Sequence, residues 1–134
     1  MLPSGLPEVV DDAEELARFL TQSGHFGADF AKPSAFLPDP KPRNTSVFRR
    51  VTDSDALRRI WRETTSGGRP LKAVAIVVAA AVRSVGLDVV PEEPPPRHAN
   101  LERWPWLEGD ASLQKAKQLE IASRLAVESR LLRL

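Results

Sequence analysis

The chain has 134 residues, of which 42% are hydrophobic and 28% are charged, and its formal net charge is +1. This composition excludes a disordered chain, and the length predicts one domain over residues 1–134. Cysteine is absent, which excludes disulfides, thiolate nucleophiles and cysteine-based metal sites.

Residues 1–12 lack the basic and apolar segments of a secretory signal, so we expect the protein to stay in the cytoplasm. The longest apolar run, residues 73–82, has half of the roughly 20 residues that a membrane-spanning helix needs. Arginine outnumbers lysine by 14 to 5, a bias that favours a GC-rich bacterial genome. These observations predict a cytoplasmic bacterial protein without a membrane segment.

Regularly spaced apolar residues predict a first helix between Pro7 and Gly24. Proline suits the first turn of a helix, and glycine suits the position beyond its end. Acidic residues in the opening turns would be favoured by the helix dipole, so we expect an acidic N-terminal helix. Its apolar positions recur at intervals of three and four, at Val10, Ala13, Leu16, Ala17 and Leu20.

A proline-rich loop and two short elements are predicted next. The four prolines of residues 25–43 favour an irregular loop, whereas β-branched and aromatic residues at 45–49 predict a strand. A second helix follows, capped by Thr52 or Asp53 and ended by the glycine-containing residues 66–70. Its expected buried stripe is Leu57, Ile60 and Trp61.

The dense apolar run at residues 72–78 predicts a central strand that is buried on both faces. A short helical turn at residues 79–84, a cap at Gly86 and another strand at 87–90 are expected to follow. These elements would place the middle of the chain in the core.

The last third of the chain predicts a stiff connector, a strand and a long helix. Three prolines at residues 94–96 form an extended connector, and residues 98–103 predict a strand. Asp110 or Ser112 would cap a helix over residues 111–132. Apolar residues outside its main stripe suggest a protein partner or self-association through this C-terminal helix, namely Ile121, Leu131, Leu132 and Leu134.

The expected fold class is therefore α+β, a single small domain with three to four short strands and helices packed on the sheet. Charge is uneven along this chain. Residues 1–40 carry two bases and seven acids, net −5, and the basic middle, residues 41–83, carries ten bases and three acids, net +7. Either the acidic first helix folds onto the basic middle, or the basic middle binds an anionic partner.

The candidate catalytic residues are His98, Arg97 and Asn100. The chain has two histidines and no tyrosine or cysteine, so acid–base chemistry would rest on His25, His98 or carboxylates. If residues 97–102 are extended, His98 and Asn100 share one face and Arg97 points the opposite way. Both His98 and Asn100 also fit a structural role, in which they satisfy buried backbone groups near the prolines.

Five arginines of the basic middle are candidates for binding nucleic acid or a partner protein. The five are Arg49, Arg50, Arg58, Arg59 and Arg62. A helix face exposed to solvent explains most of these arginines equally well. No phosphate-binding glycine loop and no metal-binding motif is present in the sequence, so we expect neither a metal nor another cofactor.

Five segments of the chain form a distinctive set. They are Ala-Phe-Leu-Pro-Asp-Pro at 35–40, Ser-Val-Phe-Arg at 46–49, Gly-Leu-Asp-Val-Val-Pro at 86–91, Pro-Arg-His-Ala-Asn-Leu at 96–101 and Trp-Pro at 104–105. Together they resemble a group of small uncharacterised bacterial proteins with an Arg-His-Ala-Asn segment followed by Trp-Pro. The resemblance extends from residue 15 to the final helix and implies no activity, but it favours Arg97, His98 and Asn100 as site residues. Arg103 stands where the group has glycine, which predicts a different local turn.

Two functional hypotheses follow, and they leave open whether the protein is an enzyme. In the first, an accessory interaction protein binds a partner protein, with nucleic acid as a second class of partner, through the basic middle and residues 97–100. In the alternative, a small metal-independent nuclease or phosphotransfer enzyme of the toxin type uses His98 with Arg97 and Asn100.

Overall fold

Six antiparallel strands pair in one sheet in the computed structural model, which describes residues 1–51, 53–64 and 68–134. Their order is β4-β5-β2-β1-β3-β6, and the α+β fold class is confirmed. The strands are β1 (Glu15–Leu20), β2 (Thr45–Arg49), β3 (Ala73–Val78), β4 (Asp88–Pro91), β5 (His98–Glu102) and β6 (Arg130–Arg133). The helices are α1 (Ser54–Thr64), α2 (Ala79–Ser84) and α3 (Ala111–Glu128), with 3-10 turns at Ser23–His25 and Pro33–Ala35.

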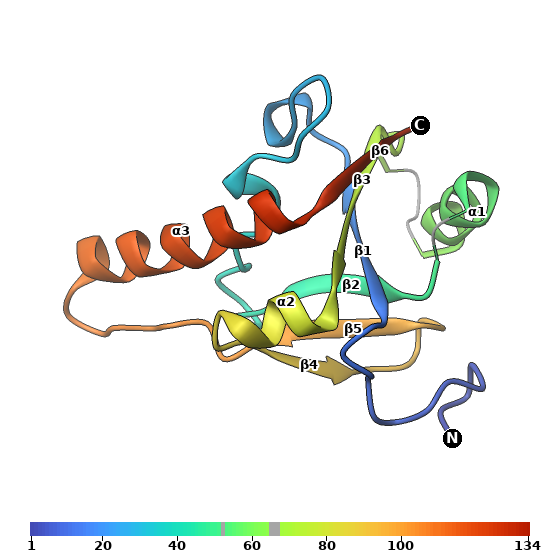
Figure 1. Cartoon of the computed structure of the whole chain (residues 1–134), viewed down its shortest axis with the longest axis horizontal. Helices are drawn as coiled ribbons and strands as arrows, with labels where there is room; N and C mark the ends of the chain where they lie inside the picture. The colour runs from blue at the N-terminus through green and yellow to red at the C-terminus, as the bar shows by residue number, and fades with distance from the viewer. Residues whose placement is uncertain (52, 65–67) are drawn as a thin grey trace.

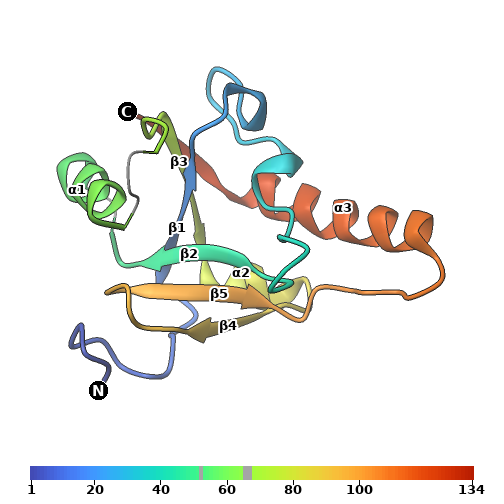
Figure 2. The same cartoon turned by 180° about the vertical axis from the view of Figure 1, so that it is seen from behind.

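The sheet is strongly bent, and helices pack on both of its faces (Figure 1). α2 and α3 lie on one side and α1 on the other, and β2, β5 and β4 run across the direction of β1, β3 and β6 (Figure 2). The bend lies between β1 and β2, which pair only at Leu16 with Arg49 and at Ala17 with Phe48. Arg18 occupies the gap between these strands.

The guanidinium of Arg18 replaces part of the missing backbone ladder. Its Nε donates to the carbonyl of Ala35 at 2.9 Å, and its Nη1 donates to the carbonyl of Ser46 at 3.1 Å. A buried carbonyl without a donor is costly. Because Arg18 donates to the carbonyl of Ser46, β2 can diverge from β1 while this carbonyl still accepts a hydrogen bond.

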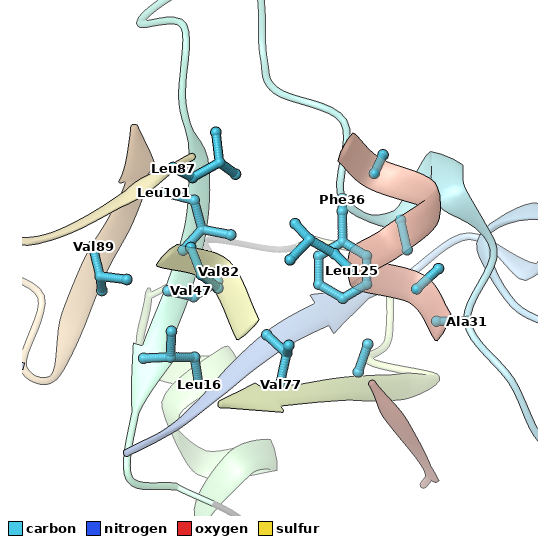
Figure 3. Packing of buried hydrophobic residues seen from close by; sticks show 14 of the residues in the cluster. Leu16, Ala31, Phe36, Val47, Val77, Val82, Leu87, Val89, Leu101 and Leu125 are labelled. Carbon is cyan, nitrogen blue, oxygen red and sulfur yellow. The ribbon is translucent and has the colours of Figure 1, made fainter. Parts of the chain in front are cut away.

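Two cores lie on opposite faces of the sheet. The larger one lies beneath α2 and α3 and contains side chains from both halves of the bent sheet (Figure 3). Among its members are Leu16, Val47, Val77, Val82, Leu101 and Leu125. The smaller one lies beneath α1 and consists of Ala17, Val51, Leu57, Val74 and Ile76.

The prediction of an acidic N-terminal helix is wrong, because residues 15–20 form β1. Leu16 and Leu20 belong to the larger core, whereas Ala17 belongs to the smaller core, where Phe19 also packs. A spacing of four fits one face of a strand as well as one face of a helix. β1 is central and buried on both sides, so its pattern does not show the alternation of a half-exposed strand.

The C-terminal helix is shorter than predicted, because it ends at Glu128 instead of residue 132 and a strand, β6, follows. Leu131 packs on the larger core, and Leu132 and Leu134 pack on the smaller one. These three leucines are therefore used within the chain. With β1 and β6 added, the sheet exceeds the three to four strands that we expected.

The other predicted strands and helices are confirmed within one or two residues of their ends. The three prolines at 94–96, which we expected to form an extended connector, instead lie in the turn that joins the antiparallel strands β4 and β5. The strands at 45–49, 72–78 and 98–103 and the helical turn at 79–84 are all present, and Gly86 has a φ of 88°. Asp110 caps α3, since its side chain accepts from the backbone N of Leu113 at 3.0 Å.

Asp53 caps α1 by accepting from the backbone N of Ala56 at 3.0 Å. Thr52, the other expected cap, lies outside the described residues, as do residues 65–67 of the predicted glycine-containing turn. Within the described part of the chain, no helix has both the length and the apolar character of a membrane span.

Four arginines in the left-handed backbone region bracket β2 and β5. The φ angles are 69° for Arg43, 56° for Arg50, 69° for Arg97 and 72° for Arg103. Because β2 and β5 are antiparallel neighbours, each end of this two-strand ladder has two such arginines. Arg103 thus adopts a backbone conformation that glycine also favours. The different local turn expected there stays a prediction.

Candidate functional site

The loop between β4 and β5 is held in place by one carboxylate. We call this loop, residues 93–97, the proline turn. Glu93 accepts from the backbone N of Ser4 at 2.9 Å, from the hydroxyl of Ser4 at 2.6 Å and from the backbone N of Arg97 at 3.2 Å. Burial raises the pKa of Glu93, but these hydrogen bonds and the charge of Arg49 outweigh burial, so the pKa lies below its ordinary value.

His98 begins β5 directly after the proline turn and is 8% exposed. Its Nδ1 lies 2.9 Å from the carbonyl of Glu92, and its Nε2 lies 2.5 Å from the hydroxyl of Ser46. A carbonyl can only accept a hydrogen bond, so the proton of the neutral ring belongs on Nδ1, and Nε2 accepts from Ser46. The ring also packs edge-on against Phe48, with 5.4 Å between centroids.

Alternation along β5 agrees with the expected two faces, except at Arg97. Ala99 and Leu101 belong to the larger core, so His98 and Asn100 share the opposite face. Asn100 is 3% exposed. Arg97 does not join Ala99 in the core, because it precedes the strand and its positive φ redirects its side chain to the surface.

Two adjoining pockets between α1 and the proline turn form a groove, which we call the α1 groove. The volumes of the pockets are about 490 Å³ and about 440 Å³. Thr64 and Pro95 line both pockets, so the pockets adjoin along these two residues. The first pocket is otherwise lined by Arg59, Ile60, Glu63, Pro94, Pro96 and Arg97.

Aromatic rings form an apolar wall of the second pocket. Phe19 and Phe48 stack with 4.8 Å between centroids, and Trp61 meets Phe19 edge-on at 6.0 Å. The indole N–H of Trp61 donates to the carbonyl of Arg69 at 2.8 Å, which fixes the ring. The polar residues of this pocket are Arg18, Thr21, Ser46, Thr64 and His98.

Arg18 supplies the permanent positive charge of the second pocket. Burial lowers the pKa of Arg18, and the charge of Asp39 only partly offsets this effect. An arginine pKa starts so high that the group stays protonated at neutral pH. The pocket therefore combines one cation with a hydroxyl, an imidazole and aromatic rings.

The five arginines proposed to bind a partner do not lie on one surface. The side chain of Arg49 is fully buried and bonds Glu14 through Nε at 2.7 Å and Nη2 at 3.0 Å. Arg50 also pairs with Glu14. Burial raises the pKa of Glu14, but the hydrogen bonds and charges of Arg49 and Arg50 outweigh burial and keep it below its ordinary value.

The three arginines of α1 divide between two sides of the helix. Arg58 and Arg62 line a small pocket with Trp61, Pro70 and Leu71, whereas Arg59 lines the α1 groove. Of the five, Arg59 is the one that lies with Arg97.

His25 lies in the 3-10 turn at Ser23–His25 and is not among the residues that line the pocket of His98. Burial lowers the pKa of His25, and the charge of Arg18 lowers it further. The groove thus offers one imidazole, so it does not support a phosphodiester mechanism that uses both histidines.

Sequence reasoning missed Arg18, Phe19 and Ser46 as site residues. Arg18 and Phe19 were assigned to a helix, and only a strand at 15–20 brings them to the groove. Ser46 had a usable signal, because it alternates with Phe48 on a correctly predicted strand and lies in a segment that carries the resemblance.

No family model, curated protein or solved structure matches this chain, so the resemblance noted in the sequence remains a prediction. Among residues 1–51, 53–64 and 68–134, no three His, Cys, Asp or Glu side chains form a group that could hold a metal ion.

Proposed function

We propose that this protein is an accessory interaction protein that binds an acidic segment of a partner protein in the α1 groove. One observation carries the proposal. Arg59, from the basic middle at residues 41–83, and Arg97, from the segment at 97–100, line the same pocket. The two features that the sequence singled out separately thus belong to one surface.

Charge supports an acidic partner. The charged side chains that line the two pockets are Arg18, Arg59, Arg97 and Glu63, apart from the titratable His98. Three cations against one carboxylate give a positive potential along the groove, which attracts anions and accelerates their association.

The lining also supports a peptide with apolar side chains between its acidic ones. Prolines 94–96 and the aliphatic side chain of Ile60 line the first pocket, and the aromatic wall of Phe19, Phe48 and Trp61 lines the second. Pockets of this size hold a few side chains of an extended peptide. Glu93 already fixes the proline turn, so little ordering is needed when a partner binds.

A protein partner is favoured over nucleic acid by the positions of the remaining arginines. Arg49 and Arg50 are engaged by Glu14, and Arg58 and Arg62 lie on the other side of α1. The groove therefore lacks the row of free cations that follows a phosphate backbone.

A photo-crosslinking amino acid at the exposed Thr64 tests the proposal in native cells. We expect crosslinking to one protein through a segment rich in Asp or Glu, and a loss of roughly tenfold or more in Arg59→Glu/Arg97→Glu. The matched control Arg58→Glu/Arg62→Glu makes the same charge change outside the groove and should crosslink normally.

Two results would contradict the proposal. One is loss of crosslinking in the control and not in the groove variant. The other is retention of the wild-type protein on DNA, with a steep salt dependence that Arg59→Glu/Arg97→Glu removes, since this would assign the groove to nucleic acid.

A further inference from the structure

Ser46 and His98 form a hydrogen-bonded pair in the wall of the second pocket of the α1 groove. In the register of β2 and β5, Ser46 opposes Asn100 and Phe48 opposes His98. Ser46 and His98 are therefore diagonal neighbours on one face of the sheet. The proposed binding of an acidic partner rests on Arg59 and Arg97 of the first pocket and does not use this pair.

The pair has the geometry of an activated nucleophile. Nε2 of His98 lies 2.5 Å from Oγ of Ser46 and accepts its proton, and the carbonyl of Glu92, 2.9 Å from Nδ1, orients the ring. A nucleophile, a base and a third group that orients the base define covalent catalysis by serine. We propose that Ser46 is a nucleophile that His98 activates for attack on carboxylic esters bound in this pocket.

The proposed reaction has two balanced steps. Nε2 of His98 takes the proton of Ser46 as Oγ bonds to the ester carbonyl carbon, and the departing alkoxide receives that proton as the C–O bond breaks. Water then attacks the acyl group on Ser46, while Nε2 takes a proton from the water and returns it to Oγ. An ester and water give a carboxylic acid and an alcohol.

The pocket selects the class of ester. The rings of Phe19, Phe48 and Trp61 favour a flat, apolar acyl group, and a volume of about 440 Å³ limits it to a small one. Arg18 bonds the carbonyls of Ala35 and Ser46 through Nε and Nη1, and neither hydrogen bond uses Nη2. The positive charge of Arg18 stabilises the negative charge that develops on the carbonyl oxygen of the ester during attack.

A fluorophosphonate probe tests the nucleophile in the full-length chain. Oγ of Ser46 should displace fluoride and add one phosphonyl group, which intact-protein mass spectrometry detects and peptide mapping places on Ser46. We expect no label in Ser46→Ala and labelling slower by roughly a hundredfold in His98→Gln. Ser112→Ala removes an exposed serine of α3 and should label like the wild type.

Thermal unfolding of each variant verifies that it is folded. If a variant fails to fold, peptide mapping of the labelled wild-type protein still decides the proposal. Faster hydrolysis of 4-nitrophenyl phenylacetate than of the acetate would support the assigned substrate class. Absence of label in the folded wild type, label on serines other than Ser46, or equal labelling of Ser46→Ala would overturn the proposal.

Discussion

Arg49 is a fully buried cation that pairs with Glu14. Glu14 bonds it through two nitrogens, and the carbonyl of Pro7 accepts from Nη1 at 2.8 Å. A buried ion pair adds little to stability by itself, but removal of one partner leaves an uncompensated charge in the interior. The N-terminal segment up to Glu14 is thereby tied to β2.

Glu14→Gln should destabilise the protein by about 3–5 kcal/mol, because it removes the charge of the one carboxylate that is hydrogen-bonded to the buried guanidinium of Arg49. The free energy of unfolding from urea titration measures this change. Glu15→Gln is the matched control, since Glu15 pairs with Arg130 at the surface at 2.9 Å and should cost less than about 1 kcal/mol. Equal effects of the two substitutions would contradict the role assigned to Glu14.

Acid should release the proline turn from the N-terminal segment. The pKa of Glu93 is lowered in the folded protein, so its stabilising effect is present above the ordinary pKa of a glutamate and is lost as the pH falls through the lowered folded value. The amide resonances of Ser4 and Arg97 should shift together over that range. In Glu93→Gln this shared transition should be absent, and a transition that persists in this variant would refute the assignment.

At the scale of elements, the predictions were correct where the residue pattern fits only one type of secondary structure, helix or strand. Residues 45–49 combine β-branched and aromatic residues, and they form β2. Residues 15–20 place apolar side chains at a spacing that fits both a helix and a strand, and their burial on both faces is a property of the sheet. Residues 130–133 follow a helix without a glycine or proline, so local sequence did not mark the end of α3.

β6 should protect the edge of β3. Deletion of residues 130–134 removes the packing of Leu131 and Leu132 and should lower the free energy of unfolding by about 3 kcal/mol. It also exposes β3, in which all six residues are apolar, at an open edge of the sheet. We therefore expect the truncated chain to self-associate in size-exclusion chromatography.

The control for this deletion is Arg130→Ala/Arg133→Ala. It removes the exposed side chains of β6 and keeps its leucines. If the deleted chain is as stable as this variant and elutes at the same volume, β6 does not have the role that we assign to it.

At the scale of the whole molecule, the uneven charge distribution has an intramolecular explanation. Asp12 pairs with Arg83 at 2.6 Å, and Glu14 pairs with Arg49 and Arg50. The acidic start of the chain therefore folds onto the basic middle, as one of the two readings of the sequence expected, although it does so without a helix. Cations that remain outside these pairs form the positive side of the α1 groove.

The candidate site could be predicted only in part, because it is assembled from segments that are distant in sequence. The importance of Arg97 and His98 could be inferred locally, from the turn and the strand that follows it. Their meeting with Arg18, Ser46 and Arg59 depends on the order of strands β5-β2-β1 and on the position of α1 over them. Local periodicity carries no information on this order.

The left-handed arginines at the ends of β2 and β5 have a consequence at the level of the gene. Every arginine codon becomes a glycine codon by a single base change, and glycine relieves the strain of a positive φ. A single point mutation can therefore replace Arg43, Arg50, Arg97 or Arg103 with glycine, for which a positive φ carries no strain. A scan of single-nucleotide variants would separate arginines whose side chains matter from those that only occupy a turn.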